Sequence, residues 1–225
     1  MFEQAQIVER VGTLRDAYDR SRESRTPASG RIKLNKHRIV FFAGDPVERF
    51  FEVESGAVMI YRMLDDGRRQ LVEVVFAGGI VGLSAGEFHE SSCETLTPSV
   101  LRSFKSSELA QSDALRTRVV KRLQIQLSSM HDHVVSLGRK TAEERVCTLI
   151  VRMCELEHSG ANAADAIALP MSRSEIADYL GLTLETVCRT LNDLARRGFV
   201  EMGARKSEIK VPDLGRLRQA ACCDA

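Results

Sequence analysis

The segment from Leu169 to Met202, LPMSRSEIADYLGLTLETVCRTLNDLARRGFVEM, constrains the fold of this chain more than any other stretch. It contains two short helical patterns joined by a tight turn. Ser172 and Glu175 have the spacing of a capping box, in which each side chain satisfies a backbone N–H at the start of a helix. Gly181 can adopt the positive φ that a sharp turn requires, and Thr183 can cap the following helix. This arrangement predicts a helix-turn-helix.

The second helix of this segment has two faces of opposite character. Apolar residues recur at steps of three, four and three and should form one buried stripe, which consists of Leu184, Val187, Leu191 and Leu194. The opposite face carries Glu185, Cys188, Arg189 and Asn192. An arginine can bind guanine O6 and N7 with two hydrogen bonds, and a glutamate can accept one from a cytosine amino group. We interpret this helix as a DNA-reading helix; the alternative is a plain helical hairpin with solvated charges.

Two short alternating runs follow this helix. Phe199–Met202 and Ser207–Val211 are separated by Gly203, Arg205 and Lys206, a pattern typical of a two-stranded wing. Such a wing could lie on DNA phosphates. The tail after Pro212 should form one or two helical turns, DLGRLRQA, and end in Cys222-Cys223 without a role.

The run LGLTLETVCRTLNDL resembles the DNA-reading helix of the Crp/Fnr transcription regulators, whose Fnr and FixK branches use E-T-x-S-R. The resemblance implies that Glu185, Cys188 and Arg189 read a TTGA…TCAA inverted repeat, with Cys188 in the place of the family's Ser. It also implies contacts with RNA polymerase, from the loop His158–Asp165 and the hairpin around Asp65, Asp66 and Gly67, although both are explained equally well as surface turns. The residues assigned to DNA binding are Glu185, Cys188, Arg189, Thr183, Ser172 and Arg173.

Cys188 is in addition a candidate redox site. Its thiol should face solvent in the absence of DNA, and exposed thiols are oxidised first. The alternative is that Cys188 is a small side chain that fits against a thymine methyl group.

Residues 31–104 have the short alternating runs of β-strands, among them RIVFF, FFEVES, AVMIYRM and QLVEVVF. Turn signals separate them at Gly44-Asp45-Pro46, Ser55-Gly56, Asp66-Gly67 and Gly78-Gly79. The pattern predicts an antiparallel β-roll or jelly roll. The region also resembles the cyclic-nucleotide-binding fold of the Crp/Fnr family.

The roll lacks the family's ligand-binding residues. Where nucleotide-binding members have Gly-Glu and Arg-Ser pairs, Gly82 is followed by Leu83, and Ser91 stands in the position of the Arg. A buried phosphate without a cation would keep an uncompensated charge. An Fe–S cluster needs four thiolates, and Cys93 is the single cysteine before Cys147. We therefore expect no cofactor and a FixK-like regulator that needs no effector; a ligand-gated sensor with an unidentified effector remains the alternative.

One motif suggests an enzyme, and the histidines suggest a metal site. Gly82–Gly86 matches the G-x-S-x-G nucleophile elbow, with Ser84 as nucleophile, but the sequence behind it is not helical and the alternating β/α pattern is missing. His131 and His133 are two residues apart, so on a helix they cannot share a metal. We therefore expect neither catalysis nor a metal ion.

The region from Ser112 to about Leu137 predicts a long helix with an a/d seam. The seam consists of Val120, Leu123, Leu127, Met130, Val134 and Leu137. Val119 and Ile125 lie off the seam and could contact the roll, which leaves the seam for a second copy of the chain. We expect a parallel homodimer, because a symmetric pair of helix-turn-helix units reads a palindrome.

These patterns together predict an α+β protein with a cyclic-nucleotide-binding-like β-roll, a long dimerisation helix and a C-terminal winged helix-turn-helix. The expected parts are an N-terminal helix and linker (1–30), the roll (31–111), the dimerisation helix (112–138), which Gly138 interrupts, and the DNA-binding domain (139–225). Within the last part, SGANAADAIA is expected to be a flexible loop.

Composition limits the partners and the compartment. No stretch has the apolar length of a membrane span or the core of a signal peptide, and the six cysteines show no disulfide pattern, so a cytoplasmic protein is expected. The 225-residue chain has a net charge of +1, and residues 141–225 hold 11 basic and 13 acidic residues, a net charge of −2. We therefore expect DNA binding through a few placed contacts rather than through bulk charge.

Overall fold

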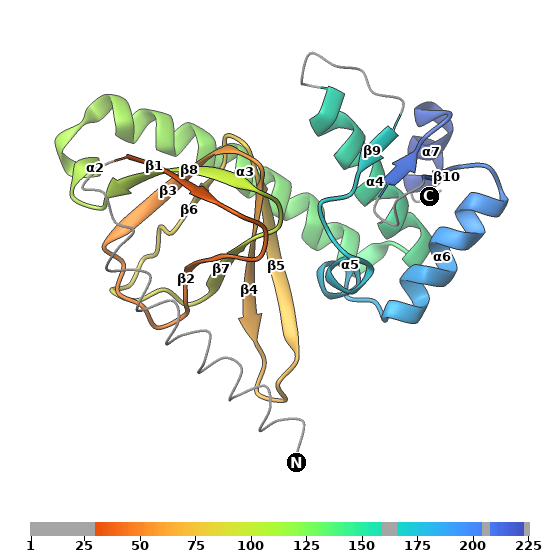
Figure 1. Ribbon diagram of the computed structural model, residues 1–225, viewed down its shortest axis with the longest axis horizontal. Helices are drawn as coiled ribbons and strands as arrows, with labels where there is room; N and C mark the ends of the chain where they lie inside the picture. The colour runs from red at the N-terminus through yellow and green to blue at the C-terminus, as the bar shows by residue number, and fades with distance from the viewer. Residues whose placement is uncertain (1–29, 159–165, 204–207, 223–225) are drawn as a thin grey trace. The chain divides into compact units, whose positions relative to one another are not determined.

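The computed structural model describes residues 30–158, 166–203 and 208–222 (Figure 1). The chain divides into two compact units, residues 1–128 and 129–225, and the boundary falls within the long helix α3 (Asp113–Arg139). The expected N-terminal helix, residues 159–165 of the loop His158–Asp165 that was expected to contact RNA polymerase, and Cys223 lie outside the described residues.

The first unit contains two four-stranded antiparallel sheets, as the alternating runs predict. One sheet has the order β1-β8-β3-β6, and its strands are β1 (Gly30–Leu34), β8 (Ser99–Lys105), β3 (Arg49–Ser55) and β6 (Ile80–Val81). The other has the order β2-β7-β4-β5, with strands β2 (Ile39–Phe41), β7 (Ser92–Thr95), β4 (Ala57–Met63) and β5 (Arg69–Phe76). Of the predicted turn glycines, Gly44, Gly56, Gly67 and Gly78 have positive φ, whereas Gly79 does not. At Gly56 (φ 84°) a Cβ would lie 2.5 Å from the carbonyl oxygen of Pro98.

A continuous apolar core joins the two sheets. Residues from both belong to it, namely Leu34, Val40, Phe41, Phe51, Val53, Val58, Val75, Val81, Cys93 and Leu101. Period-two alternation produces this arrangement, because every second side chain of a strand points to the same face. The β-roll therefore has the packed apolar interior that the strand patterns predict.

A short helix, α2 (Glu108–Gln111), precedes α3, which packs on the roll through a second apolar cluster. Val119 is 3% exposed and packs with Phe50 and Ile80, as expected. The expectation for Ile125 is wrong, because this residue is 59% exposed. Leu123 packs on the cluster instead: four residues after Val119 it shares that face of the helix, whereas six residues place Ile125 about 120° away. Gly138 does not interrupt the helix either, because α3 continues through it to Arg139.

The second unit combines helices with a small sheet. Its helices are α4 (Ala142–His158), α5 (Arg173–Leu180), α6 (Leu184–Arg196) and α7 (Leu214–Ala221). The wing is present, with strands β10 (Glu201–Met202) and β11 (Glu208–Lys210) that are shorter than predicted. β9 (Ala166–Ala168), expected to be part of a flexible loop, is a third strand, because its backbone pairs with the other edge of β11. Among the described helices, none has the length and apolar character needed to cross a membrane.

Candidate nucleic-acid interface

The start of α5 has the predicted capping box. The Ser172 hydroxyl accepts a hydrogen bond from the Glu175 backbone N–H (3.3 Å), and the Glu175 carboxylate accepts one from the Ser172 backbone N–H (2.7 Å). Glu175 is only 4% exposed, so these hydrogen bonds satisfy a buried carboxylate as well as the helix end. The sequence signal therefore located the first helix of the motif correctly.

The turn and the second cap are also as predicted. Gly181 ends α5 in the left-handed conformation, with φ 63°, and the Thr183 hydroxyl accepts a hydrogen bond from the Thr186 backbone N–H (3.1 Å). The second helix of the motif, α6, therefore begins at Leu184.

The apolar residues buried on α6 are Val187, Leu191 and Leu194, each 2% exposed or less, and Thr190 is buried beside them. Leu184, predicted to belong to it, is 50% exposed, so that expectation is wrong. Leu184 points in nearly the same direction around the helix axis as Leu191, but it is the first residue of α6 and lies at the end of the packed stripe.

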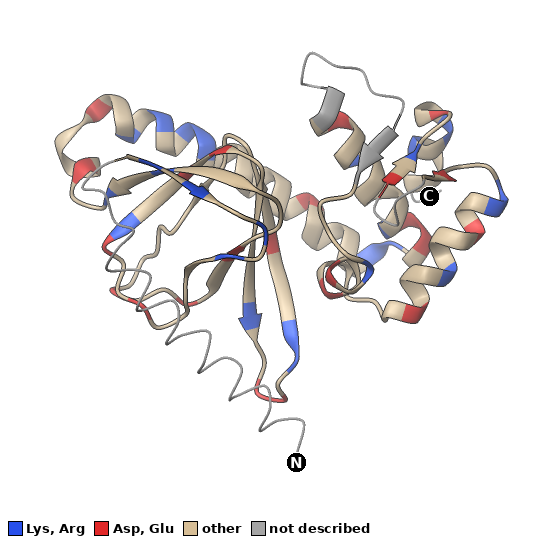
Figure 2. Ribbon diagram, viewed as in Figure 1, with Lys and Arg blue, Asp and Glu red and all other residues tan. Residues whose placement is uncertain are grey.

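The opposite face of α6 is a continuous polar surface. Glu185, Cys188 and Arg189 are all exposed on it, as predicted. They line one shallow, open hollow together with Asn192, Asp193 and Arg196. Figure 2 shows acidic and basic bands alternating along this helix. Arg196, which pairs with Asp193, was not assigned to the site from sequence, although it lies seven residues after Arg189 and hence near the same helix face.

Arg173, the first residue of α5, lies near Cys188. Burial lowers the pKa of Arg173, and the nearby Cys188 sulfur acts in the opposite direction. The structure therefore brings together a guanidinium and a thiol from the two helices of the motif, which sequence spacing alone does not reveal.

The described cysteines fall into two groups. Cys93, Cys147 and Cys154 are buried, and burial raises the pKa of Cys147 to about 12 and that of Cys93 above its usual value. Cys188 and Cys222 are exposed. An oxidant would therefore meet Cys188 and Cys222 before the buried thiols, and Cys188 lies on the polar face of α6.

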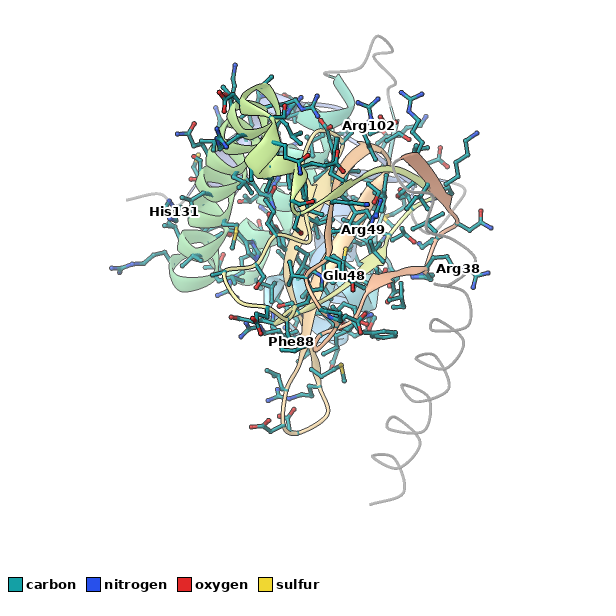
Figure 3. All side chains as sticks on the ribbon, turned by 90° about the vertical axis from the view of Figure 1, so that its left-hand side faces the viewer. Arg38, Glu48, Arg49, Phe88, Arg102 and His131 are labelled. Atoms are coloured by element: carbon teal, nitrogen blue, oxygen red, sulfur yellow. The ribbon has the colours of Figure 1, made fainter. Side chains whose placement is uncertain are left out.

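The predicted seam of α3 is exposed at three positions one heptad apart. Val120, Leu127 and Val134 are 49%, 53% and 64% exposed. Leu123, Met130 and Leu137 are half-buried, and Leu123 packs on the roll of its own chain. An apolar stripe therefore runs along α3, while part of the predicted seam is already in contact within the chain. His131 of α3 is exposed (Figure 3).

Two serines of the roll, Ser91 in the position of the family's Arg and Ser84 of the G-x-S-x-G motif, have partners within the protein. The Ser91 hydroxyl accepts a hydrogen bond from Arg62 Nε (3.1 Å), and Arg62 also pairs with Glu90.

Ser84 donates a hydrogen bond to the carbonyl oxygen of Phe88 (3.3 Å), in an irregular segment that no helix follows. This is not the strand–nucleophile–helix geometry of a hydrolase elbow. Phe88 lies at the edge of the roll (Figure 3) and is 58% exposed.

A helix-turn-helix with a wing, whose second helix exposes a polar face, is the architecture of a DNA-binding transcription regulator. Comparison with known proteins agrees in both units. Residues 144–220 match the Crp-like helix-turn-helix domain, and residues 31–112 match the cyclic nucleotide-binding domain. The chain belongs to the Crp/Fnr family of transcription regulators and is FixK-like within it.

The relatives cover most of the chain. The nitrogen fixation regulation protein FixK of Rhizobium meliloti (strain 1021) is 35% identical over 178 residues, which are 78% of this chain and 81% of the relative. FixK of Bradyrhizobium diazoefficiens is 33% identical over 174 residues, 76% of this chain and 73% of the relative. The solved structure of FixK2 from Bradyrhizobium japonicum is 33% identical, with a TM-score of 0.74, and the match covers 88% of this chain and 99% of that one.

Proposed function

We propose that two copies of this chain associate along α3, read a TTGA…TCAA inverted repeat and activate transcription. The polar face of α6 carries this proposal, because it exposes Glu185, Cys188 and Arg189 opposite a fully buried stripe. The family's E-T-x-S-R pattern occupies this face, with Cys188 in the place of the Ser. Activation is proposed from the relatives, which include the transcriptional activator FnrL of Cereibacter sphaeroides, 28% identical over 194 residues.

Each residue of the face has a base that suits its chemistry. Arg189 matches the two acceptors of guanine, and Glu185 can accept a hydrogen bond from a cytosine amino group. Cys188 and the exposed Leu184 offer apolar contact to thymine methyl groups.

In this proposal, the N-terminal ends of α5 and α6 bind phosphate groups of the DNA backbone. Ser172 and Thr183 cap α5 and α6, whose N-termini favour anions. Arg173 in the first turn of α5 adds a positive charge there. These contacts set the register of the protein on DNA but do not read sequence. Because the DNA-binding region has a net charge of −2 and contacts few phosphates in this proposal, its affinity should depend less steeply on salt than that of a protein that binds through bulk positive charge.

The exposed stripe of α3 supports the proposed homodimer. Residues one heptad apart stay on one side of a supercoiled helix pair, and Val120, Leu127 and Val134 have this spacing. Two copies joined there would present two α6 helices to a palindrome.

We also propose that the roll needs no effector. Apolar side chains from both sheets fill the space between them. Arg62, the cation that donates a hydrogen bond to Ser91, is already paired with Glu90. Cyclic AMP should therefore leave DNA affinity unchanged in a titration. A rise of more than about tenfold, equivalent to roughly 1.4 kcal/mol, would show that the roll is a ligand-gated sensor.

Two further assignments complete the proposal. The β4–β5 hairpin around Asp65, Asp66 and Gly67 contacts RNA polymerase, and its Asp66 is exposed and paired with Arg68. The chain acts in the cytoplasm, where its DNA target and polymerase are found.

Footprinting of the purified protein on genomic DNA fragments tests the central claim. We expect protected segments that contain TTGA…TCAA, and we expect a duplex with one scrambled half-site to bind much more weakly. Protection without a shared sequence, or equal affinity for the scrambled duplex, would refute sequence-specific recognition of this palindrome.

A further inference from the structure

Arg145, in the first turns of α4, donates hydrogen bonds to three backbone carbonyl groups from separate parts of the second unit. Its Nη2 lies 2.7 Å from the Leu137 oxygen of α3, and its Nη1 lies 3.0 Å from the Leu180 oxygen of α5. Its Nε lies 2.9 Å from the Lys140 oxygen in the segment between α3 and α4. One side chain therefore connects the end of α3, the α3–α4 junction and the end of α5.

These acceptors lie where helices leave carbonyl groups without internal partners. Leu137 is in the last turn of α3, and Leu180 is the last residue of α5. Carbonyl groups in a last turn carry the negative end of the helix dipole, which favours a cation. A guanidinium is planar and rigid, so three simultaneous hydrogen bonds fix the directions of their acceptors relative to one another.

The turn of the helix-turn-helix lies at the same place. A Cβ atom built on Gly181 would lie 3.8 Å from Arg145 Nη1 and 3.8 Å from Leu137 Cδ2. Gly181 leads directly into the Thr183 cap of α6, so the position of this turn determines where α6 starts. The last turn of α3 and the start of the recognition helix are therefore held together through Arg145.

We infer that Arg145 is a positioning residue for DNA recognition that sets the distance between half-sites accepted by the dimer. This inference rests on the proposed function, in which α3 carries the dimer contact and α6 reads each half-site. Two recognition helices fit successive major grooves when the half-sites lie about one helical turn apart. If the angle between α3 and α6 is fixed, the dimer binds best at one distance between half-sites. If that angle varies, the dimer binds several distances with similar affinity. Arg145 touches no base in this role.

The test uses the full-length protein and a set of duplexes in which two TTGA/TCAA half-sites are separated by spacers that differ by one base pair. The dissociation constant is measured for each duplex at one salt concentration, for the wild type, Arg145→Lys and Arg145→Met. Lysine keeps the charge and much of the stem but lacks the fork that reaches three carbonyl groups. It therefore carries the test if the Met variant does not fold. Arg218→Met is the matched control, because Arg218 lies in the same unit and pairs with Glu155 at the exposed surface (2.9 Å).

We expect the wild type and Arg218→Met to prefer one spacing over its neighbours by about tenfold or more. In the Arg145 variants this preference should fall below about threefold, while single-base changes within a half-site keep their wild-type effects. A purely structural role would weaken binding equally at every spacing, and that result, or an unchanged spacing profile, overturns the inference. If the wild type itself shows no advantage for paired half-sites, the proposed dimeric recognition fails as well.

Discussion

His133 of α3 lies flat against Tyr179 of α5, with ring centroids 4.0 Å apart and ring planes 5° from parallel. Nε2 of His133 is buried and has no hydrogen-bond partner among the described residues. Burial is the main cause that lowers the pKa of His133, and Arg152 and Arg145 of α4 lower it further. A hydrogen bond with the Tyr179 backbone acts in the opposite direction. The contact between α3 and the helix-turn-helix therefore favours a neutral imidazole.

This environment predicts that the second unit loses stability in mild acid. Because the pKa of His133 is lower in the folded protein than in the unfolded chain, the unfolded chain binds more protons once the pH falls below about 6.5. The contribution is fully present above that pH and is lost as the pH falls toward the folded-state pKa. Urea unfolding monitored at a series of pH values between 5 and 8 should show this loss in the wild type.

His133→Phe should remove that component of the pH dependence, since phenylalanine keeps a ring against Tyr179 but does not titrate. His131→Phe is the matched control, because His131 is exposed two residues away on the same helix, and it should retain the wild-type profile. Identical profiles for the wild type and His133→Phe would show that other groups cause the acid sensitivity.

Replacing Arg189 with Ala should remove recognition of one base. The loss should be about 1 to 3 kcal/mol on the preferred half-site and should flatten the preference at the guanine position. Arg196→Ala removes the same charge from the same face, but Arg196 pairs with Asp193 near the end of α6. It should weaken binding without changing the preferred sequence. Selection from random duplexes distinguishes the two results; an unchanged half-site for Arg189→Ala would contradict its role in base reading.

Local sequence signals located the candidate interface well. Three features could be predicted because each depends on backbone groups only a few residues away. They are the capping box at Ser172, the glycine turn at Gly181 and the Thr183 cap. Helical periodicity predicted the polar face of α6 correctly, because the direction of a side chain around a helix axis depends only on its position in the helix. Periodicity did not predict the exposure of Leu184. It gives the direction of a side chain around the helix axis, but it does not show whether another element covers the end of the helix.

Contacts between distant segments could not be predicted in this way. Arg145 and Leu180 are 35 residues apart, and His133 and Tyr179 are 46 apart, so no local pattern pairs them. β9 was missed because Ala166–Ala168 has little strand character of its own and is ordered by pairing with β11. Leu123 fits the seam pattern, yet it packs on the roll of its own chain. An apolar pattern on a helix does not show whether the residue contacts its own chain or a second copy.

A charge placed at Leu127 should separate the proposed dimer. Leu127→Glu would bury an unpaired carboxylate in an apolar contact, and binding to the full palindrome should fall with dissociation. Ile125→Glu is the matched control: Ile125 is similarly exposed, 59% against 53%, but lies about 160° away around α3. Sedimentation should find Ile125→Glu dimeric and Leu127→Glu monomeric. If Leu127→Glu sediments as a dimer, the subunits associate elsewhere.

Oxidation of Cys188 should prevent DNA binding without unfolding the protein. The thiol is exposed on the polar face of α6, beside Glu185 and Arg189 and near Arg173. Peroxide converts such a thiol first to a sulfenic acid and then, with further peroxide, to sulfinic and sulfonic acids. The last two would place a negative charge and additional oxygen atoms against the charge of DNA. Binding should therefore fall steeply while the circular dichroism spectrum stays unchanged.

Two serine variants assign this effect to one sulfur atom. Cys188→Ser keeps a small hydroxyl, the group that the family has at this position, and should bind DNA before and after peroxide treatment. Cys222→Ser removes the other exposed thiol of the described chain and should remain as sensitive as the wild type. If Cys188→Ser loses binding to the same extent as the wild type, another residue is the target of oxidation. If the wild type keeps its affinity after mass spectrometry confirms a sulfinic acid at Cys188, the thiol fills space against the DNA and does not act as a redox switch.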